Sequence, residues 1–146
     1  MKVIGFNLTK ISGERFPKYE RKTPPTINVD ITSIEKDSVE MLKDSEALRI
    51  LFKHVVFYTK DIKSKDKEAE VSIEGVIVVS ASKDEVKDVL KEWKKKQLPD
   101  GFRSSIYNLI FQKCTPRTIS LQDEIGLPSH IPLPRYQIQQ KDSPKN

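Results

Sequence analysis

The chain has 146 residues, of which 36% are hydrophobic and 32% charged, which is the length and composition of one ordinary globular domain. A single cysteine excludes an intrachain disulfide and a multi-cysteine zinc site. The formal net charge is +5, and the basic excess lies at the two ends of the chain. The opening residues lack the continuous apolar stretch of a signal peptide, and no run is long enough to cross a bilayer, so we expect a cytoplasmic protein.

Four strands are predicted in the first part of the chain. Apolar residues alternate with polar ones over residues 4–8 and again over 27–31, which is the period of a half-buried strand. Residues 47–59 and 71–79 form two longer strands that are apolar on both parities, so both of their faces are expected to be covered over part of their length. The short connections between the strands favour an antiparallel sheet.

Two main helices are predicted after the fourth strand. Ser82 and Glu85 stand at the spacing of a capping box, and apolar residues at helical spacing continue to Trp93. Asp100 is the predicted N-cap of the second helix. We expect that helix to end at Pro116, because proline removes a backbone donor and clashes with the preceding turn.

The C-terminal part is predicted to be irregular. A short third helix is expected over residues 120–125, ended by Gly126, and the proline-containing segment 127–134 is expected to be extended. Residues 137–146 form a polar tail. No interior linker divides the chain, so we predict one α+β domain over residues 1–136, in which a four-stranded antiparallel sheet is followed by two main helices packed on one face.

The sequence offers no arrangement of residues for catalysis, metal binding or cofactor binding. The five glycines stand singly, so there is no phosphate-binding loop. His54 and His130 each lack a second ligand at metal spacing, which favours structural or surface roles for both. Cys114 falls on the apolar side of the predicted second helix, where an inert buried thiol is expected. We therefore predict a non-enzymatic protein without cofactor or metal.

The apolar residues exceed what two helices can cover. Two helices of this length cover one face of a four-stranded sheet and leave the other face open. The remaining apolar residues then need a partner, which can be a second subunit, the N-terminal aromatic loop or a bound client chain. A closed homo-oligomer is the expected assembly.

The elements come in a recognisable order. The strand VIGFNLTKIS precedes an aromatic and proline-containing loop, and three strands follow as a meander: PTINVDI, ALRILFKHVVFYT and AEVSIEGVIVV. The helix DGFRSSIYNLIFQKC comes next, and the extended segment LPSHIPLPRY follows it. This order, over residues 1 to about 136, resembles that of the SecB-like superfamily of export and holdase chaperones. The C-terminal run, a capped helix with Trp93 followed by LQDEIGLPSHIPLPR, is also similar to archaeal proteins of the same length. Ile73-Glu74-Gly75 is similar to the I-x-G segment that closes the fourth strand in that superfamily.

The resemblance implies a function as well as a fold. It implies a holdase chaperone that binds unfolded or nascent polypeptides in apolar grooves between the sheet and the helices, without a catalytic residue. Burial of apolar surface would supply the affinity, and low sequence specificity would follow because this effect is non-directional. The candidate client-binding residues are aromatic and come from the first loop, the long third strand and the first helix: Phe16, Tyr19, Phe57, Tyr58 and Trp93.

Two other readings stay open. The basic ends can serve a nucleic-acid or ribonucleoprotein accessory protein, whose affinity would fall steeply with salt. The residues that would contact phosphates in that case are Lys10, Arg15, Lys18, Arg21 and Lys22, with Lys94, Lys95 and Lys96 as a second patch. The third reading is an oligomeric adaptor that has no client of its own.

Overall fold

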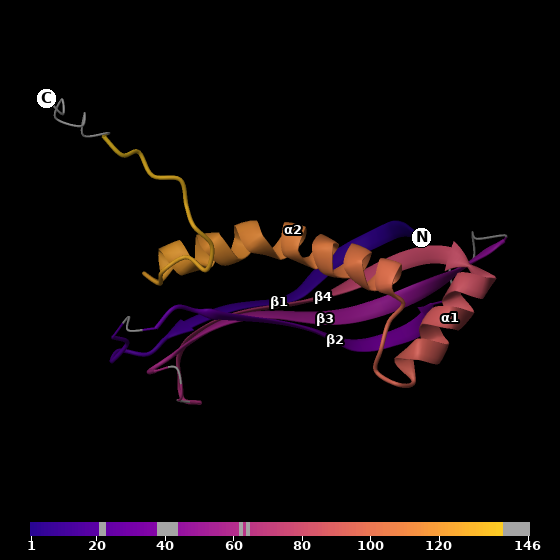
Figure 1. Ribbon diagram of the computed structural model, residues 1–146, viewed down its shortest axis with the longest axis horizontal. Coiled ribbons are helices and arrows are strands. Elements are labelled where there is room, and N and C mark those ends of the chain that lie inside the picture. The colour runs from indigo at the N-terminus through magenta and orange to yellow at the C-terminus, as the bar shows by residue number, and fades with distance from the viewer. Residues whose placement is uncertain (21–22, 38–43, 62, 64, 139–146) are drawn as a thin grey trace, which may run out of the picture.

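The computed structural model describes all residues except 21–22, 38–43, 62, 64 and 139–146. It contains one antiparallel sheet in the strand order β1-β4-β3-β2, followed by two helices (Figure 1). The predicted α+β architecture is confirmed. The elements are β1 (Lys2–Arg15), β2 (Thr26–Asp37), β3 (Ser45–Thr59), β4 (Lys67–Ser82), α1 (Lys83–Trp93) and α2 (Asp100–Glu124).

The core lies between the helices and one face of the sheet. Strands β2, β3 and β4 form a meander, and β1 returns to pair with the outer edge of β4. In the central pair, the register places Ile50 opposite Ile77 and His54 opposite Ile73, and all four side chains are buried. Because side chains alternate along a strand, every second residue of β3 and β4 faces the helices. The helices lie on the same side of the sheet, with α1 near the end where β1 begins (Figure 1).

The opposite face of the sheet has only a narrow apolar strip. Leu51 lies opposite Val76, while Lys53 lies opposite Glu74 one pair further along. Val76 is buried and Leu51 is half-buried, although neither helix packs on this face. The long polar side chains beside them cover part of the apolar surface. The prediction that helices cover one face of the sheet is therefore confirmed.

Helix α1 begins as the sequence predicts. The backbone N–H of Glu85 donates to the hydroxyl oxygen of Ser82 at 3.2 Å, which satisfies one of the unpaired donors of the first turn. The carboxylate of Glu85 pairs with the N-terminal ammonium of Met1 at 3.5 Å. Val86 and Val89 are buried in the main core, so α1 is held against the sheet along one apolar stripe.

Helix α2 is longer than the sequence predicts. It runs without interruption over 25 residues, so the predicted end at Pro116 and the separate third helix over 120–125 are both wrong. Pro116 lies on the exposed side of the helix, and the guanidinium of Arg117 donates to the carbonyl of Lys113 at 2.8 Å. Asp100 is the first helical residue and binds Arg103, while Pro99 occupies the N-cap position that the sequence gives to Asp100.

The buried residues of α2 follow a strict spacing of four. They are Phe102, Ile106, Ile110, Cys114, Thr118 and Gln122. Each step of four residues turns the contact line by about 40° around the helix, because an α-helix has 3.6 residues per turn. The contact line therefore winds around α2, as a twisted sheet beneath the helix requires.

Gly75 lies in the middle of β4 and does not close that strand, which continues to Ser82. The expectation drawn from the I-x-G resemblance is wrong on this point. A Cβ on Gly75 would stand 2.7 Å from both the carbonyl oxygen of Asn7 and the ring of Phe52. The rings of Phe6 and Phe52 stack at 5.5 Å between centroids. Gly75 thus allows β1 and two aromatic rings to approach the centre of the sheet.

Candidate functional site

Helix α2 covers the centre of the sheet and leaves its margins open. Its principal sheet contacts are with β4 and β3. The outer strands β1 and β2 therefore extend beyond the helix on either side, with apolar side chains on the face that points towards it. At these two margins, four large apolar side chains of β1, β2 and α2 remain more than a third exposed: Val3 at 40%, Ile11 at 51%, Ile27 at 39% and Phe111 at 38%. Two apolar margins therefore run along α2.

The first margin, which we call the β1 flank, lies between β1 and α2. We define it by Val3, Phe6, Leu8 and Ile11 of β1 together with Leu121 and Ile125 of the C-terminal end of the helix region. At one end, the space above Gly13 is closed, because a Cβ there would stand 3.2 Å from Ile125. Arg15 also donates to the carbonyl oxygens of Ile125 and Gly126, each at 3.1 Å. The remainder of the β1 flank is open to solvent at Val3 and Ile11.

The second margin, the β2 flank, lies between β2 and α2. We define it by Ile27 and Val29 of β2, Phe111 of α2 and His54 of β3 beneath them. The ring of His54 meets Phe111 edge to face at 6.1 Å and His130 at 6.3 Å. His130 belongs to the segment that follows α2, so this flank is partly covered by the C-terminal part of the chain.

A polar network fixes that C-terminal segment. The side-chain amide nitrogen of Gln122 donates to the hydroxyl oxygen of Tyr58 at 2.8 Å, and the Tyr58 hydroxyl donates to the carbonyl of Pro128. The amide oxygen of Gln122 lies 3.1 Å from Nδ1 of His130, so it accepts when that nitrogen carries the proton. Leu127 is buried beside Tyr58. The segment after α2 is therefore held by both apolar and hydrogen-bonding contacts.

Burial controls the ionisation of the groups in this region. Burial, with a smaller contribution from His130, lowers the pKa of the His54 imidazole from 6.5 to about 4. Burial also lowers the pKa of His130 and raises the pKa of Tyr58 to about 12. Among the described residues, His54 has no hydrogen-bond partner at either ring nitrogen and is fully buried. These groups are therefore neutral at pH 7 and give the β2 flank no fixed charge.

The structure separates the five aromatic candidates. Tyr19 and Tyr58 are buried and meet edge to face at 5.7 Å, so they belong to a small core beneath the C-terminal segment. Trp93 is half-buried against the main core, with the ammonium of Lys96 4.5 Å from its ring centre. Phe16 is 44% exposed, and Phe57 is half-buried on the opposite face of the sheet from the helices.

Phe16 and Phe57 are near one another in the fold. Both lie close to the start of β4, where Lys67 stands 5.2 Å from the Phe57 ring centre and lines a shallow cavity of about 320 Å³ together with Phe16. Glu14 and Glu70 also line that cavity. Its mixed charges make it less apolar than the two flanks.

The structure does not gather the basic candidates into one surface. Lys10 lies opposite Glu74, and Arg15 is bound to the end of α2. Lys18 is exposed in the loop after β1, while Lys94, Lys95 and Lys96 follow α1 near the other end of the sheet (Figure 1). Arg21 and Lys22 lie outside the described residues.

Cys114 is buried, and burial raises the pKa of its thiol to about 11, which leaves it protonated. Within the described residues, no group of three or more His, Cys, Asp or Glu side chains is arranged to hold a metal ion. No helix formed by those residues combines the length and the apolar character that a membrane span needs.

Comparisons with known proteins give a match among solved structures. No family model matches the sequence, and no curated protein matches it. A solved structure does match: the Rv1957 SecB-like chaperone of Mycobacterium tuberculosis, in complex with a ChAD peptide from the Rv1956 HigA1 antitoxin. The match covers 94% of this chain and 91% of that chain, with a TM-score of 0.46 and 12% identity.

The most exposed apolar residues of the flanks were not among the sequence candidates. In the sequence, Val3, Ile11 and Ile27 look like ordinary strand residues. The alternation of apolar and polar residues predicts which face of a strand is buried, but not how far the helix above that face extends. Phe111 stands next to Ile110 in the sequence but on a different side of α2, and only the winding contact line distinguishes them. Aromatic character alone directs attention to Tyr19 and Tyr58, which are core residues.

Proposed function

We propose that this protein is a non-enzymatic polypeptide-binding protein of the holdase type, and that extended segments of unfolded chains bind along the β1 flank. The observation that carries this proposal is the exposure of Val3 and Ile11 on β1, the strand whose outer edge has no partner among the described residues. A free edge offers a row of backbone donors and acceptors, and the flank offers apolar contacts beside it. Together these suit an extended chain of almost any sequence.

The expected energetics agree with loose and unspecific binding. Covering one half-exposed aliphatic side chain contributes on the order of 1 kcal/mol, at about 25 cal/mol per Å² of apolar surface. Two such residues give weak affinity on their own, and backbone pairing along β1 adds to it without reading the sequence of the client. No nucleotide is required, because binding and release follow from the equilibrium alone.

The test is suppression of aggregation by the purified protein. A chemically unfolded model protein is diluted into buffer without ATP, and light scattering is followed with increasing amounts of this chain. We expect suppression that persists at higher salt, since apolar contacts are not screened. The double variant Val3→Thr/Ile11→Thr keeps β-branched side chains and should need about fivefold more protein for half-suppression.

A matched control is Leu133→Thr, which removes an apolar residue that is 50% exposed but lies in the C-terminal segment. This control should suppress aggregation as the parent does. Failure of the parent protein to suppress aggregation would contradict the holdase proposal. Equal loss in both variants would instead mean that exposed apolar area acts without the β1 flank. A change of oligomeric state in the double variant alone would assign the flank to contact between copies of this chain.

A further inference from the structure

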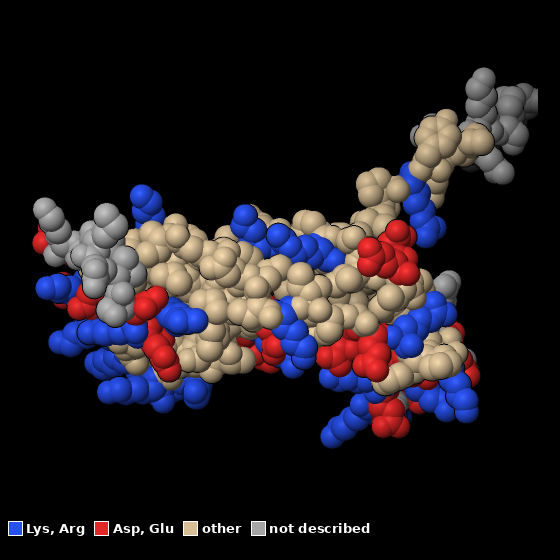
Figure 2. Space-filling view, turned by 180° about the vertical axis from the view of Figure 1, so that it is seen from behind, with Lys and Arg blue, Asp and Glu red and all other residues tan. Residues whose placement is uncertain are grey.

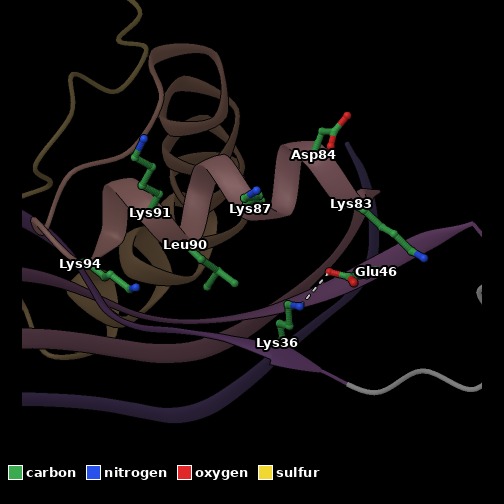
Figure 3. Close-up of a pocket in the computed structure, with 8 residues that line it drawn as sticks. All are labelled: Lys36, Glu46, Lys83, Asp84, Lys87, Leu90, Lys91 and Lys94. Carbon is green, nitrogen blue, oxygen red and sulfur yellow. Dashed lines mark ion pairs between the residues drawn. The ribbon is translucent and has the colours of Figure 1, made fainter.

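A second surface lies beside α1, at the end of the sheet on which this helix packs. A groove with a volume of about 480 Å³ runs between α1 and the ends of β2 and β3 (Figure 3). We call it the lysine groove, and its lining consists of Lys36, Glu46, Lys83, Asp84, Lys87, Leu90, Lys91 and Lys94. All eight belong to the part of the chain that the structure describes. None of these residues is part of either flank.

The lysines of α1 form a regular row. Lys83, Lys87, Lys91 and Lys94 are separated by four, four and three residues, so they lie along one side of the helix. The rise of 1.5 Å per residue places their backbone positions about 4.5 to 6 Å apart along the helix axis. Lysine and arginine side chains are grouped at this end of the molecule in the view from behind (Figure 2).

The opposite wall is partly neutralised. Lys36 of β2 pairs with Glu46 of β3 at 3.3 Å, as the dashed line in Figure 3 marks. Five lysines against two carboxylates leave the lining with a formal charge of +3. Since Lys36 already has a carboxylate, the row on α1 carries most of the charge that a bound anion would meet.

The groove also has an apolar floor. Leu90 points from α1 into the space between the helix and β2 (Figure 3). The lining includes neither an arginine nor an aromatic ring. Arginine forks and stacking rings are the usual means of holding phosphates and bases.

We propose that the lysine groove binds an acidic polypeptide segment in which carboxylates alternate with apolar side chains. In an extended chain, every second side chain points the same way, and these side chains are about 6.6 to 6.8 Å apart. That spacing is close to the spacing of the lysines on α1, so successive carboxylates face successive ammonium groups. Side chains of the other parity are then available to contact Leu90. This partner site is separate from the proposed holdase function.

The experiment measures binding of a fluorescent peptide of alternating Glu and Leu by anisotropy. Two double variants each remove two positive charges. Lys87→Gln/Lys91→Gln changes the groove, and Lys10→Gln/Lys113→Gln changes exposed lysines outside it. We expect the groove variant to weaken Kd by about tenfold and the control variant by less than about twofold. Both should melt at the parent temperature, because all four side chains are exposed.

Two further probes test the class of partner. A peptide of alternating Glu and Ser has the same charge without the apolar side chains, and we expect it to bind more weakly than the Glu–Leu peptide. Equal affinity of the two peptides would reduce the groove to a charged patch and overturn the proposal. Equal weakening by the two double variants would do so as well. Tighter binding of a single-stranded oligothymidine, lost only in the groove variant, would assign the groove to nucleic acid.

The outcome is independent of the holdase test. Lys87→Gln/Lys91→Gln should suppress aggregation as well as the parent does, and Val3→Thr/Ile11→Thr should bind the Glu–Leu peptide as the parent does. Loss of both activities in either variant would mean that one surface serves both, which contradicts the separation proposed above.

Discussion

The two flanks of α2 share the same arrangement of strand and helix but differ in how far another segment covers them. On both sides, an outer strand presents apolar residues that the helix does not reach. The β2 flank then receives the segment after α2, through Leu127, Pro128 and His130. The β1 flank is closed at one end, where Ile125 lies over Gly13 and Arg15 binds the carbonyl of Ile125, and Val3 and Ile11 stay exposed. The difference teaches that one C-terminal segment covers one margin of a four-stranded sheet and leaves apolar residues of the other margin exposed.

The two flanks also differ in chemistry. The floor of the β1 flank is aromatic and aliphatic, with Phe6 stacked on Phe52. The β2 flank contains two imidazoles and lies beside the Gln122 network. Apolar packing should therefore determine how much the β1 flank contributes to stability. Hydrogen bonding and pH should influence the contribution of the β2 flank. The following predictions test that division.

The largest effect on stability is expected from a substitution of Gly75, which lies beneath the β1 flank. Gly75→Ala places a methyl group 2.7 Å from the Asn7 carbonyl and the Phe52 ring, which requires backbone movement. We expect the free energy of unfolding, measured in urea, to fall by about 3 kcal/mol. Gly101→Ala is the matched control, since nothing lies within 4 Å of its Cβ, and it should change stability by less than about 1 kcal/mol. Equal stability of the two variants would contradict the close approach of β1 to β4.

A pH effect of similar size is expected in the β2 flank. The pKa of His54 is lowered to about 4 in the folded protein, so the unfolded chain binds the proton more tightly. The free energy of unfolding should therefore decrease as pH falls from about 6.5 to about 4, by about 3 kcal/mol for this group, and change little below that. His54→Leu should remove this part of the pH dependence. An unchanged slope in that variant, measured by urea unfolding at several pH values, would exclude His54 as its source.

A smaller effect is expected from the network that holds the C-terminal segment. Gln122→Leu leaves Nδ1 of His130 without its partner and removes one hydrogen bond from Tyr58. We expect a loss of about 1 to 3 kcal/mol and faster hydrogen exchange at the Leu127 amide, which donates to the Gln122 carbonyl. Gln112→Leu, on the exposed side of α2, is the control and should leave both unchanged. Equal exchange rates in the two variants would mean that Leu127 packing alone holds the segment.

The strands were predictable because their apolar alternation is a local signal. The α1 cap was predictable for the same reason, since Ser82 and Glu85 are three residues apart. The continuation of α2 past Pro116 was not, because it depends on buried contacts of Thr118 and Gln122 with distant parts of the chain. Polar residues at four-residue spacing do not read as an apolar helical stripe.

The sequence predicted the type of candidate site but not its position. The sequence indicates grooves between sheet and helices, but their position depends on which strands α2 covers. That choice follows from the order β1-β4-β3-β2, and nothing near β1 in the sequence specifies that it pairs with β4. Tyr19 was predicted as a client-binding residue because it is an aromatic residue of the first loop, and its burial against Tyr58 arises from a contact between distant segments.

The pairing of β1 with β4 has a consequence for the order of folding. Strands β2, β3 and β4 follow one another directly and can form by closing short loops. Strand β1 must wait for a partner that ends at Ser82, and its residue Arg15 contacts a carbonyl 110 residues away. Contacts of such separation form slowly, because the entropy of closing the loop is lost before they stabilise the fold. Of the four strands, β1 is therefore synthesised first and joins the sheet last.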